Sequence, residues 1–307
     1  MKVLIQNYTT NSTTEPLYIS ECVNSVDGCE AAVWNKNVSA YDMFDIVEPD
    51  LFITHLSLLT PDIIKYLSQN KSISAIFNVT MVEQMHVDQL DSMVSENKIQ
   101  CPFFFTNQPK ILNRLRQKNI KLVSIMHGAD IFLSQQQPVG FDYDIELGIV
   151  SNYEVGDRFK DLVDNFNSYH YLTQNTKLTE GFDISIPVMQ MYSLWNKYRK
   201  IVITMDDMYL PQSFFDAIVY GNDVFYHPKY GSMKGKMNSN LQSMLGISQS
   251  LSCSFEQIVS GQDHSDVKKK ILDRHTCAHR VKRMFSQLNC SEIERGLSNM
   301  ISRIKEQ

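Results

Sequence analysis

Residues 50–79 read DLFITHLSLLTPDIIKYLSQNKSISAIFNV, which is a strand, a helix and a second strand in direct succession. The β-branched and aromatic run at 50–57 and the apolar run at 74–79 have the length of strands and are typical of strands buried on both faces. Between them, Thr60 suits the N-cap of a helix, and Pro61 suits its first position, where a missing N–H does no harm. This succession predicts a right-handed βαβ unit with parallel strands.

The same alternation runs along most of the chain. Strand-length apolar runs are separated by helical segments with turn residues at their ends, and Thr14, Glu15 and Pro16 suit another helix start. Such alternation predicts a parallel sheet with helices on both faces. The expected strands are 2–7, 31–35, 50–57, 74–79, 102–107, 121–128, 144–151, 168–173, 200–205 and 223–228.

One segment breaks this rhythm. QQQPVGFDYD, residues 135–144, is rich in glutamine and contains Pro138 and Gly140, so we interpret it as a linker between domains. The predicted fold is α/β, with two Rossmann-like, doubly wound domains, a ligand cleft between them and a mainly helical tail. The expected domains are an N-terminal domain at 1–134 and a C-terminal domain at 145–288, followed by a helix at 289–307. In the tail we expect one long helical stretch from about Ser265 to Gln287 and a last helix from Ser291.

Composition excludes several classes of protein. The chain has 307 residues, and 43% of them are apolar, enough for two cores. No apolar run approaches the 18 to 20 or so residues of a membrane helix, and the first residues make a poor signal peptide, so we expect a soluble, cytoplasmic protein. Six cysteines without a CxxC pair argue against a zinc ribbon or a disulfide framework. The formal charge of −5 gives no overall attraction to nucleic acid.

Two segments carry a resemblance to a known family. Residues 191–228 contain a helix, the strand IVITM and then PQSFFDAIVYGNDVFYHP, in which Asp216 precedes Gly221 by five positions. The second segment is HTCAHRVKRMF, residues 275–285. Together they resemble GT-B glycosyltransferases, most of all the spore-maturation CgeB-like group. The order of strands and helices fits that group over nearly the whole chain.

The resemblance implies a sugar-transfer enzyme that binds a nucleotide sugar as its donor and needs neither a metal nor another cofactor. The carboxylate of Asp216 is expected to accept hydrogen bonds from the ribose hydroxyls, and Pro211 replaces a glycine expected near the diphosphate. Met208 stands where retaining relatives often carry a glutamate, which favours inversion or loss of activity. The candidate donor-binding residues are Asp216, Gln212, Ser213, Gly221, Lys229 and Lys234.

Helix starts and basic loops suit the phosphates of such a donor. Gln212 and Ser213 begin the helix, where side-chain and backbone donors can meet phosphate. Lys229 and Lys234 lie in the loop after the next strand and can offset the charge of a diphosphate leaving group. A solvated surface loop is the other interpretation of these lysines.

Two histidines at expected strand ends are candidates for catalysis on the acceptor side. His55 ends LFITH and His127 ends SIMH, and histidine titrates near neutrality, as a general base should. We prefer His127, with Asp130 as its orienting partner. Each histidine could equally be structural. His275 and His279 have the spacing of metal ligands on one helix face, but no third ligand is evident, so no metal is expected.

The sequence therefore predicts a glycosyltransferase that moves a sugar from a nucleotide-diphosphate donor to an acceptor. The acceptor is a glycan or a small metabolite, or a hydroxymethylated DNA base as in phage-type transferases. The alternative is a binding or scaffold protein that keeps the fold without catalysis. The donor sugar, the nucleotide base and the oligomeric state are left open.

Overall fold

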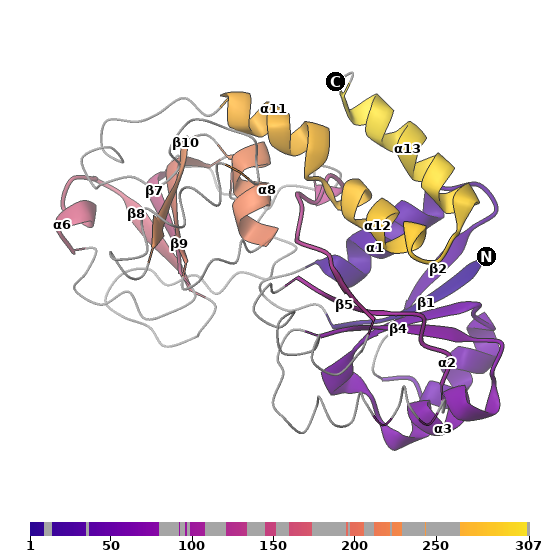
Figure 1. The fold of residues 1–307 in the computed structure, drawn as a ribbon. Coiled ribbons are helices and arrows are strands. Elements are labelled where there is room, and N and C mark those ends of the chain that lie inside the picture. The colour runs from indigo at the N-terminus through magenta and orange to yellow at the C-terminus, as the bar shows by residue number, and fades with distance from the viewer. Residues whose placement is uncertain are drawn as a thin grey trace. The chain divides into compact units, whose positions relative to one another are not determined.

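In the computed structural model the chain forms two compact units (Figure 1). One unit comprises Met1–Thr9, Thr14–His127 and Cys277–Gln307, and the other comprises Thr10–Thr13 and Gly128–Thr276. The residues that the structure describes are 1–8, 14–34, 37–79, 92, 96, 99–107, 121–133, 145–151, 160–173, 195, 197–205, 212–221, 223–228, 243 and 265–305.

The first unit is built on a six-stranded sheet in which every described pairing is parallel. The strand order is β2-β1-β3-β4-β5-β6. The strands are β1 (Lys2–Gln6), β2 (Glu30–Trp34), β3 (Leu51–His55), β4 (Ser74–Asn78), β5 (Phe104–Thr106) and β6 (Leu122–Ser124). The βαβ unit expected from residues 50–79 is confirmed, because β3 and β4 pair in parallel with Leu51 opposite Ser74. The α/β class with a parallel sheet is confirmed as well.

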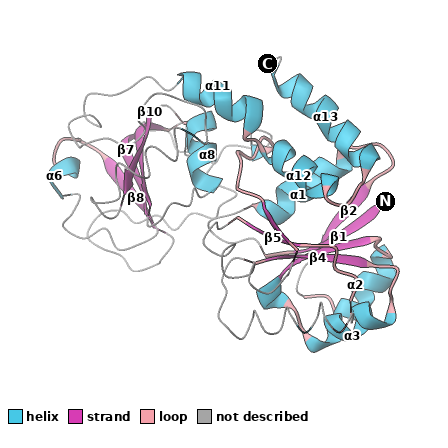
Figure 2. Ribbon diagram, viewed as in Figure 1, coloured by secondary structure: helices cyan, strands magenta, loops and turns pink. Residues whose placement is uncertain are grey.

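Helices cover both faces of this sheet (Figure 2). One face is covered by α2 (Ala40–Val47) and α3 (Pro61–Gln69), and the other by α1 (Glu15–Asn24), α12 (Cys277–Ser286) and α13 (Ser291–Lys305). A short 3-10 helix, η1 (Leu56–Leu58), follows β3. The core under α2 and α3 combines buried apolar side chains of helices and strands, among them Leu4, Phe44, Phe52, Ile63, Leu67 and Phe77.

Local sequence signals explain where these helices begin. In α3, Thr60 is the N-cap with its side chain accepting from the backbone N–H of Ile63 at 3.4 Å, and Pro61 lies in the first turn as expected. In α2 the Ser39 side chain accepts from the N–H of Asp42 at 3.2 Å. Each cap gives a partner to an N–H that has none inside the helix.

Thr60→Ala is therefore expected to lower the free energy of unfolding by about 1 kcal/mol, because the N–H of Ile63 loses its cap. Chemical denaturation of the variant measures this loss. Thr60→Ser keeps the hydroxyl and serves as the control. A Thr60→Ala protein as stable as Thr60→Ser would show that the hydroxyl does not cap the helix.

Strand β2 lies at one edge of the six-stranded sheet. The backbone groups of Glu30 and Trp34 form hydrogen bonds on the β1 side of the strand. The N–H of Glu30 donates to Met1 O, and Trp34 O accepts from Asn7 N. Ala31 therefore faces away from β1, and the side chain of Asn24 meets it there. Asn24 Oδ1 accepts from Ala31 N at 2.7 Å, and Asn24 Nδ2 donates to Ala31 O at 3.1 Å.

The second unit contains a four-stranded parallel sheet with the order β10-β9-β7-β8. Its described strands are β7 (Ile145–Ser151), β8 (Tyr169–Thr173), β9 (Tyr198–Met205) and β10 (Asp223–Pro228). Its described helices are α6 (Lys160–Val163), α8 (Gln212–Tyr220) and α11 (Ser265–Arg274). This order again places the first two strands of the unit side by side, with β9 and β10 added on the other side of β7.

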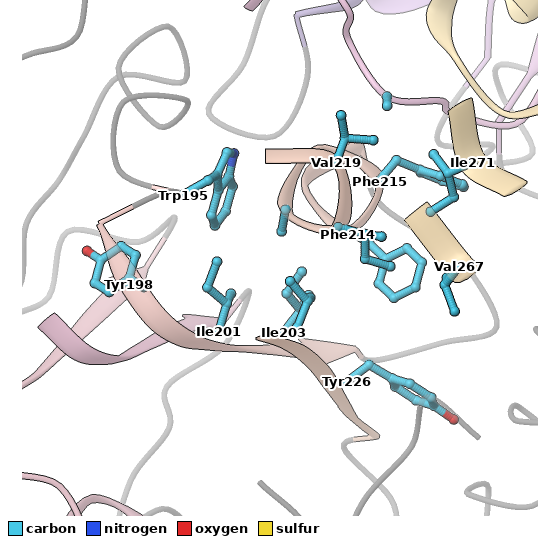
Figure 3. Packing of buried hydrophobic residues seen from close by; sticks show 14 residues of the cluster. Trp195, Tyr198, Ile201, Ile203, Phe214, Phe215, Val219, Tyr226, Val267 and Ile271 are labelled. Atoms are coloured by element: carbon cyan, nitrogen blue, oxygen red, sulfur yellow. The ribbon is translucent and has the colours of Figure 1, made fainter. Parts of the chain in front are cut away.

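Helix α8 lies between the sheet and α11 in the core of this unit (Figure 3). Phe214 and Phe215 of α8 are almost fully buried. Ile201 and Ile203 come from β9, and other members of the same cluster are Trp195, Tyr198, Val219, Tyr226, Val267 and Ile271. The apolar sequence QSFFDAIVYG thus folds as the predicted helix, which is apolar on nearly all sides because it is buried on nearly all sides.

The chain passes between the units at places other than the expected linker. It leaves the first unit after His127 and returns to it at Cys277. These places differ from the predicted boundaries at 135–144 and 289, and residues 135–144 lie outside the described residues. Within the second unit, Ala129 and Thr276 form an isolated parallel bridge, and the N–H of Ala129 donates to His275 O at 2.8 Å.

The single helical stretch expected from Ser265 to Gln287 is wrong, because two helices replace it. Helix α11 ends at Arg274 and α12 begins at Cys277, and the bridge to Ala129 occupies the two residues between them. Gly128 allows this close approach, since a Cβ there would lie 2.6 Å from the carbonyl oxygen of His275.

Candidate functional site

The carboxyl edge of the first sheet carries a group of buried polar side chains. In the order β2-β1-β3 the chain turns to opposite sides after β1 and after β3, and ligands of doubly wound sheets bind outside the carboxyl ends at such a switch point. Gln6 ends β1 and accepts a hydrogen bond from the hydroxyl of Thr54 in β3. Both side chains are buried, so polar groups lie at the switch point itself.

Glu15 is the central group of this edge. It lies in the first turn of α1 and is only 2% exposed. Tyr8 donates its hydroxyl to Oε2 at 3.0 Å, Tyr18 donates to Oε1 at 3.2 Å, and Asn78 Nδ2 donates to Oε2 at 2.5 Å. Tyr8 follows β1, Tyr18 belongs to α1 and Asn78 ends β4. Three donors from separate elements therefore hold one buried carboxyl group in place.

Glu15 titrates near neutrality. Burial raises the pKa of its carboxyl to about 7, and the hydrogen bonds from Tyr8, Tyr18 and Asn78 oppose this rise by favouring the carboxylate. Burial and the charge of Glu15 raise the pKa of Tyr8 and of Tyr18 well above the usual value, so both hydroxyls keep their protons. Within this group of four, Glu15 is the side chain that can take up or release a proton at neutral pH.

A second buried group lies beside the first, at the ends of β5 and β6. Asn107 Nδ2 lies 2.7 Å from His127 Nε2, and Arg280 of α12 donates from Nε to His127 O at 2.9 Å. Burial, followed by the charge of Arg280, lowers the pKa of His127 to about 3. A base of that strength is a weak proton acceptor at neutral pH, so the pKa of Glu15 suits a general base better than that of His127.

Two amide oxygens at this edge have no hydrogen-bond partner among the described residues. They are Oδ1 of Asn78 and Oδ1 of Asn107, and both side chains are buried. Phe105 of β5 lies opposite Asn78 in the register, and Asn107 directly follows β5, so the two amides lie at the ends of neighbouring strands. Buried acceptors of this kind are suited to hydroxyl donors of a ligand or to ordered water.

His55, the other histidine expected to act, ends β3 at the same edge. Its Nδ1 accepts from the backbone N–H of Ser57 at 3.2 Å, which places the ring proton on Nε2. Its ring centroid lies 5.9 Å from that of Tyr8. His55 is half-buried, so it lies nearer to solvent than Glu15.

In the second unit, Asp216 binds backbone and side-chain groups of its own unit. It lies within α8 and is 5% exposed. Its Oδ1 accepts from the backbone N–H of Asp130 at 2.7 Å, and its Oδ2 accepts from Gln212 Nε2 at 3.2 Å. Tyr220 donates its hydroxyl to Asp130 O at 2.7 Å. Asp216 and Tyr220 thus fasten the backbone of Asp130 to α8, and burial raises the pKa of Asp216 well above its usual value.

The other residues predicted for the donor site are dispersed. Ser213 is half-buried on α8, and Gly221 closes that helix with its N–H donating to Ala217 O at 2.7 Å. A Cβ at Gly221 would lie 2.5 Å from the same oxygen, so glycine is required for this turn. Lys229 and Lys234 lie outside the described residues. The contacts of these residues with a nucleotide remain predictions.

Other predicted roles can be located as well. Asp130, the expected partner of His127, accepts from the N–H of Phe132 at 3.0 Å, and its pairing with His127 remains a prediction. His275 lies between α11 and α12 and stacks on Phe215 with ring centroids 6.2 Å apart. It therefore does not share a helix with His279. Among the described residues, no three His, Cys, Asp or Glu side chains gather as a metal site.

Asp216→Ala is expected to lower the free energy of unfolding by about 2 kcal/mol, because the buried N–H of Asp130 loses its acceptor. Asp216→Asn keeps one carbonyl oxygen for that N–H and should lose less. Urea denaturation of both variants measures the difference. Equal losses in the two variants would mean that the bond to Asp130 does not account for the burial of this carboxylate.

Glu15, Tyr8 and Asn78 were not identified as site residues from the sequence. Glu15 beside Pro16 indicated a helix start, and a tyrosine or asparagine at a strand end is common. The sequence did contain one signal for this site. Glu15 is an acidic residue that follows the loop after the first strand, which places it at the carboxyl edge of the sheet.

No known protein family matches the chain, and no curated protein matches it in sequence. Solved structures similar to it include OtsA in its apo form, with 8% identity, 99% of each chain covered and a TM-score of 0.47. MnaA of S. aureus with UDP has 8% identity, covers 91% of this chain and 90% of its own, and has a TM-score of 0.45. CalG4, the calicheamicin glycosyltransferase, has 11% identity, coverages of 94% and 98%, and a TM-score of 0.43.

No helix in the described part of the chain combines the length and the apolar composition that crossing a membrane requires.

Proposed function

We propose that this protein is a glycosyltransferase that moves a sugar from a nucleotide-diphosphate donor to an acceptor hydroxyl bound at the carboxyl edge of the first unit. The observation that carries the proposal is Glu15, a carboxyl group with a pKa of about 7 held by three donors at the switch point of a doubly wound sheet. A general base for a hydroxyl works best when its pKa lies near the working pH.

In the proposed step Glu15 takes the proton of the acceptor hydroxyl while the acceptor oxygen attacks the anomeric carbon. A new carbon–oxygen bond forms, the bond from that carbon to the diphosphate breaks, and its electron pair leaves with the nucleoside diphosphate. Tyr8, Tyr18 and Asn78 hold the carboxylate throughout. The amide oxygens of Asn78 and Asn107, which have no partner in the described part of the chain, suit further hydroxyls of a glycan or small metabolite.

The donor half of the proposal rests on the resemblance of residues 191–228 to the donor-binding region of GT-B transferases. It assigns the nucleotide to Asp216, Gln212, Ser213, Gly221, Lys229 and Lys234. In this assignment the carboxylate of Asp216 would give up one of its two hydrogen bonds within the unit and accept hydrogen bonds from the ribose hydroxyls in its place. A hydroxymethylated base in DNA is a further acceptor to test.

A second function, binding without catalysis, is favoured by one observation. Both oxygens of Asp216 already accept hydrogen bonds within their own unit, as expected of a structural carboxylate. A scaffold protein that kept this fold would need no free carboxylate there.

Thermal unfolding with UDP, GDP, ADP, CMP and TDP tests the donor half. One nucleotide is expected to raise the stability, by roughly 2.7 kcal/mol at 100 times its dissociation constant. Incubation with the matching nucleotide sugar and with glycans, small polyols or hydroxymethylated DNA then tests transfer. Glu15→Gln should still bind the nucleotide and should transfer at least about a hundredfold more slowly.

The exposed Glu21 lies on the same helix, so Glu21→Gln is the matched control. Stabilisation by none of the nucleotides would contradict the donor half and favour the scaffold function. Full transfer by Glu15→Gln would remove Glu15 from the mechanism.

A further inference from the structure

Three sulfur-bearing side chains meet at the amino edge of the first sheet, opposite to the candidate site. Met1 N donates to Gly28 O at 3.0 Å, and the N–H of Glu30 donates to Met1 O at 3.0 Å. In a parallel pair of strands, a residue forms hydrogen bonds with the two residues on either side of the one opposite to it. Met1 bonds to Gly28 and Glu30, so it lies opposite Cys29. The register of the next pair, Lys2 opposite Glu30, agrees. The side chains of Met1 and Cys29 therefore leave the same face of the sheet from strands about 5 Å apart.

Cys290 approaches this pair from the turn before α13. Its carbonyl accepts from the N–H of Glu294 at 3.1 Å, so Cys290 is the N-cap residue of α13. Its Sγ lies 3.9 Å from Met1 Sδ. Burial raises the pKa of Cys290, and the charge of Cys29 adds to this rise. Two thiols and one thioether thus form a cluster that no step of the proposed reaction uses.

We propose that Cys29, Cys290 and Met1 form a binding site for a soft monovalent cation, Cu(I). Thiolate and thioether sulfurs select this ion over harder ones. Two sulfurs on one ion lie at most about 4.6 Å apart, taking a metal–thiolate bond of about 2.3 Å, and the 3.9 Å between Cys290 and Met1 lies within that limit. Zn²⁺ prefers four ligands from Cys, His and carboxylates, and the described residues offer no such group here.

Binding is coupled to proton release. Burial raises the pKa of Cys29 and of Cys290, so both are thiols at neutral pH. One Cu(I) replaces two protons and gives a bis-thiolate complex of charge −1, to which the thioether adds without further proton loss. The N-terminus of α13 favours the thiolate of Cys290. The carboxylates of Glu292 and Glu294, which act on Cys29 and Cys290 respectively, attract the cation.

Access is compatible with this role. Cys29 is 8% exposed, while Cys290 and Met1 are half-buried, so the cluster lies just under the surface. An ion can therefore reach the sulfurs of Cys290 and Met1 without unfolding of the core, whereas Cys29 is buried and a serine there is mostly shielded from water.

Anaerobic titration of the full chain with the bicinchoninate complex of Cu(I) tests the proposal. Cys253 lies outside the described residues and is replaced by alanine in every protein, and the intact mass is used to select preparations that retain Met1. The parent protein should withdraw one Cu(I) per chain and release two protons to a pH indicator. Cys290→Ser and Cys29→Ser should each bind at least tenfold more weakly.

Cys101→Ser is the matched control, because Cys101 is also half-buried but lies at the start of the segment before β5. It should bind as the parent does. Circular dichroism of each variant shows whether the fold is kept, and Cys29→Ala provides a second variant should Cys29→Ser fold poorly. Undiminished binding by folded Cys290→Ser, tighter binding of Zn²⁺ than of Cu(I), or no binding by the parent would each overturn the proposal.

Discussion

Replacing Glu15 with glutamine is expected to make the difference in stability between the variant and the parent depend on pH. The free energy of unfolding of the variant, relative to that of the parent, should rise by about 3 kcal/mol as the pH increases from 4 to 8. Burial raises the pKa of Glu15 from 4.5 to about 7, so the folded state holds this proton over a range where the unfolded state has lost it. The contribution of Glu15 to stability is therefore complete below pH 4.5 and is lost as the pH rises through 7. A pKa difference of 1 between the folded and unfolded states corresponds to about 1.4 kcal/mol. The glutamine of the variant cannot ionise and loses nothing.

Urea denaturation of both proteins at several pH values measures this change. The comparison uses the difference between the two proteins, so other titrating groups, including Asp216, cancel. Glu21→Gln controls for the loss of one acidic residue from α1. A difference that stays constant from pH 4 to pH 8 would show that Glu15 does not titrate in this range.

His127→Gln is expected to show the opposite dependence on pH. The free energy of unfolding of this variant, relative to that of the parent, should rise by about 3 kcal/mol as the pH falls from 7 to 4.5. Burial lowers the pKa of His127 from 6.5 to about 3, so the unfolded state binds a proton that the folded state refuses. The stability associated with the neutral ring is complete above pH 6.5 and declines as the pH falls toward 3. The interval from pH 6.5 down to pH 4.5 accounts for the expected change, at about 1.4 kcal/mol for each pH unit.

The glutamine of this variant keeps an oxygen for the amide of Asn107 and has no charge to bury, so it isolates the titration from the loss of a contact. His279→Gln, at a half-buried position of the same unit, is the control. Parallel denaturation curves for His127→Gln and the parent across this range would contradict a buried, neutral His127.

The two effects overlap in the parent protein. Between pH 4.5 and 6.5 the slope from Glu15 is negative and the slope from His127 is positive, so they nearly cancel. The raised pKa of Asp216 adds a further negative slope to the parent, so the parent profile alone does not report on Glu15 or His127. Only the single variants separate the two groups.

Much of the fold could be predicted because its strands are buried on both faces. Runs such as LFITH and SAIFN are mostly apolar along their whole length, and Thr60 with Pro61 marks a helix start by local chemistry alone. The break at His275 and Thr276 carries no glycine or proline. It arises from the bridge to Ala129, which lies 147 positions away along the chain, and so local sequence could not reveal it.

The candidate site was predictable only in its position. The carboxyl edges of the sheets follow from the alternation of strands and helices, and His55 and His127 were placed there correctly. The strength of a base, however, depends on burial and on neighbouring charges. Burial, and then the charge of Arg280 153 positions further along the chain, lower the pKa of His127. Burial raises the pKa of Glu15 against the hydrogen bonds from β4 and from the residues after β1.

The amide of Asn24 has a consequence for how molecules of this protein meet one another. A parallel sheet with an open edge can accept a strand from a neighbouring molecule and so begin an aggregate. At Ala31 both outward-facing backbone groups of β2 are already bonded to this one side chain, which imitates the next strand. A neighbouring chain would have to displace Asn24 before it could pair with Ala31, so the last residue of α1 blocks the extension of the sheet at this position.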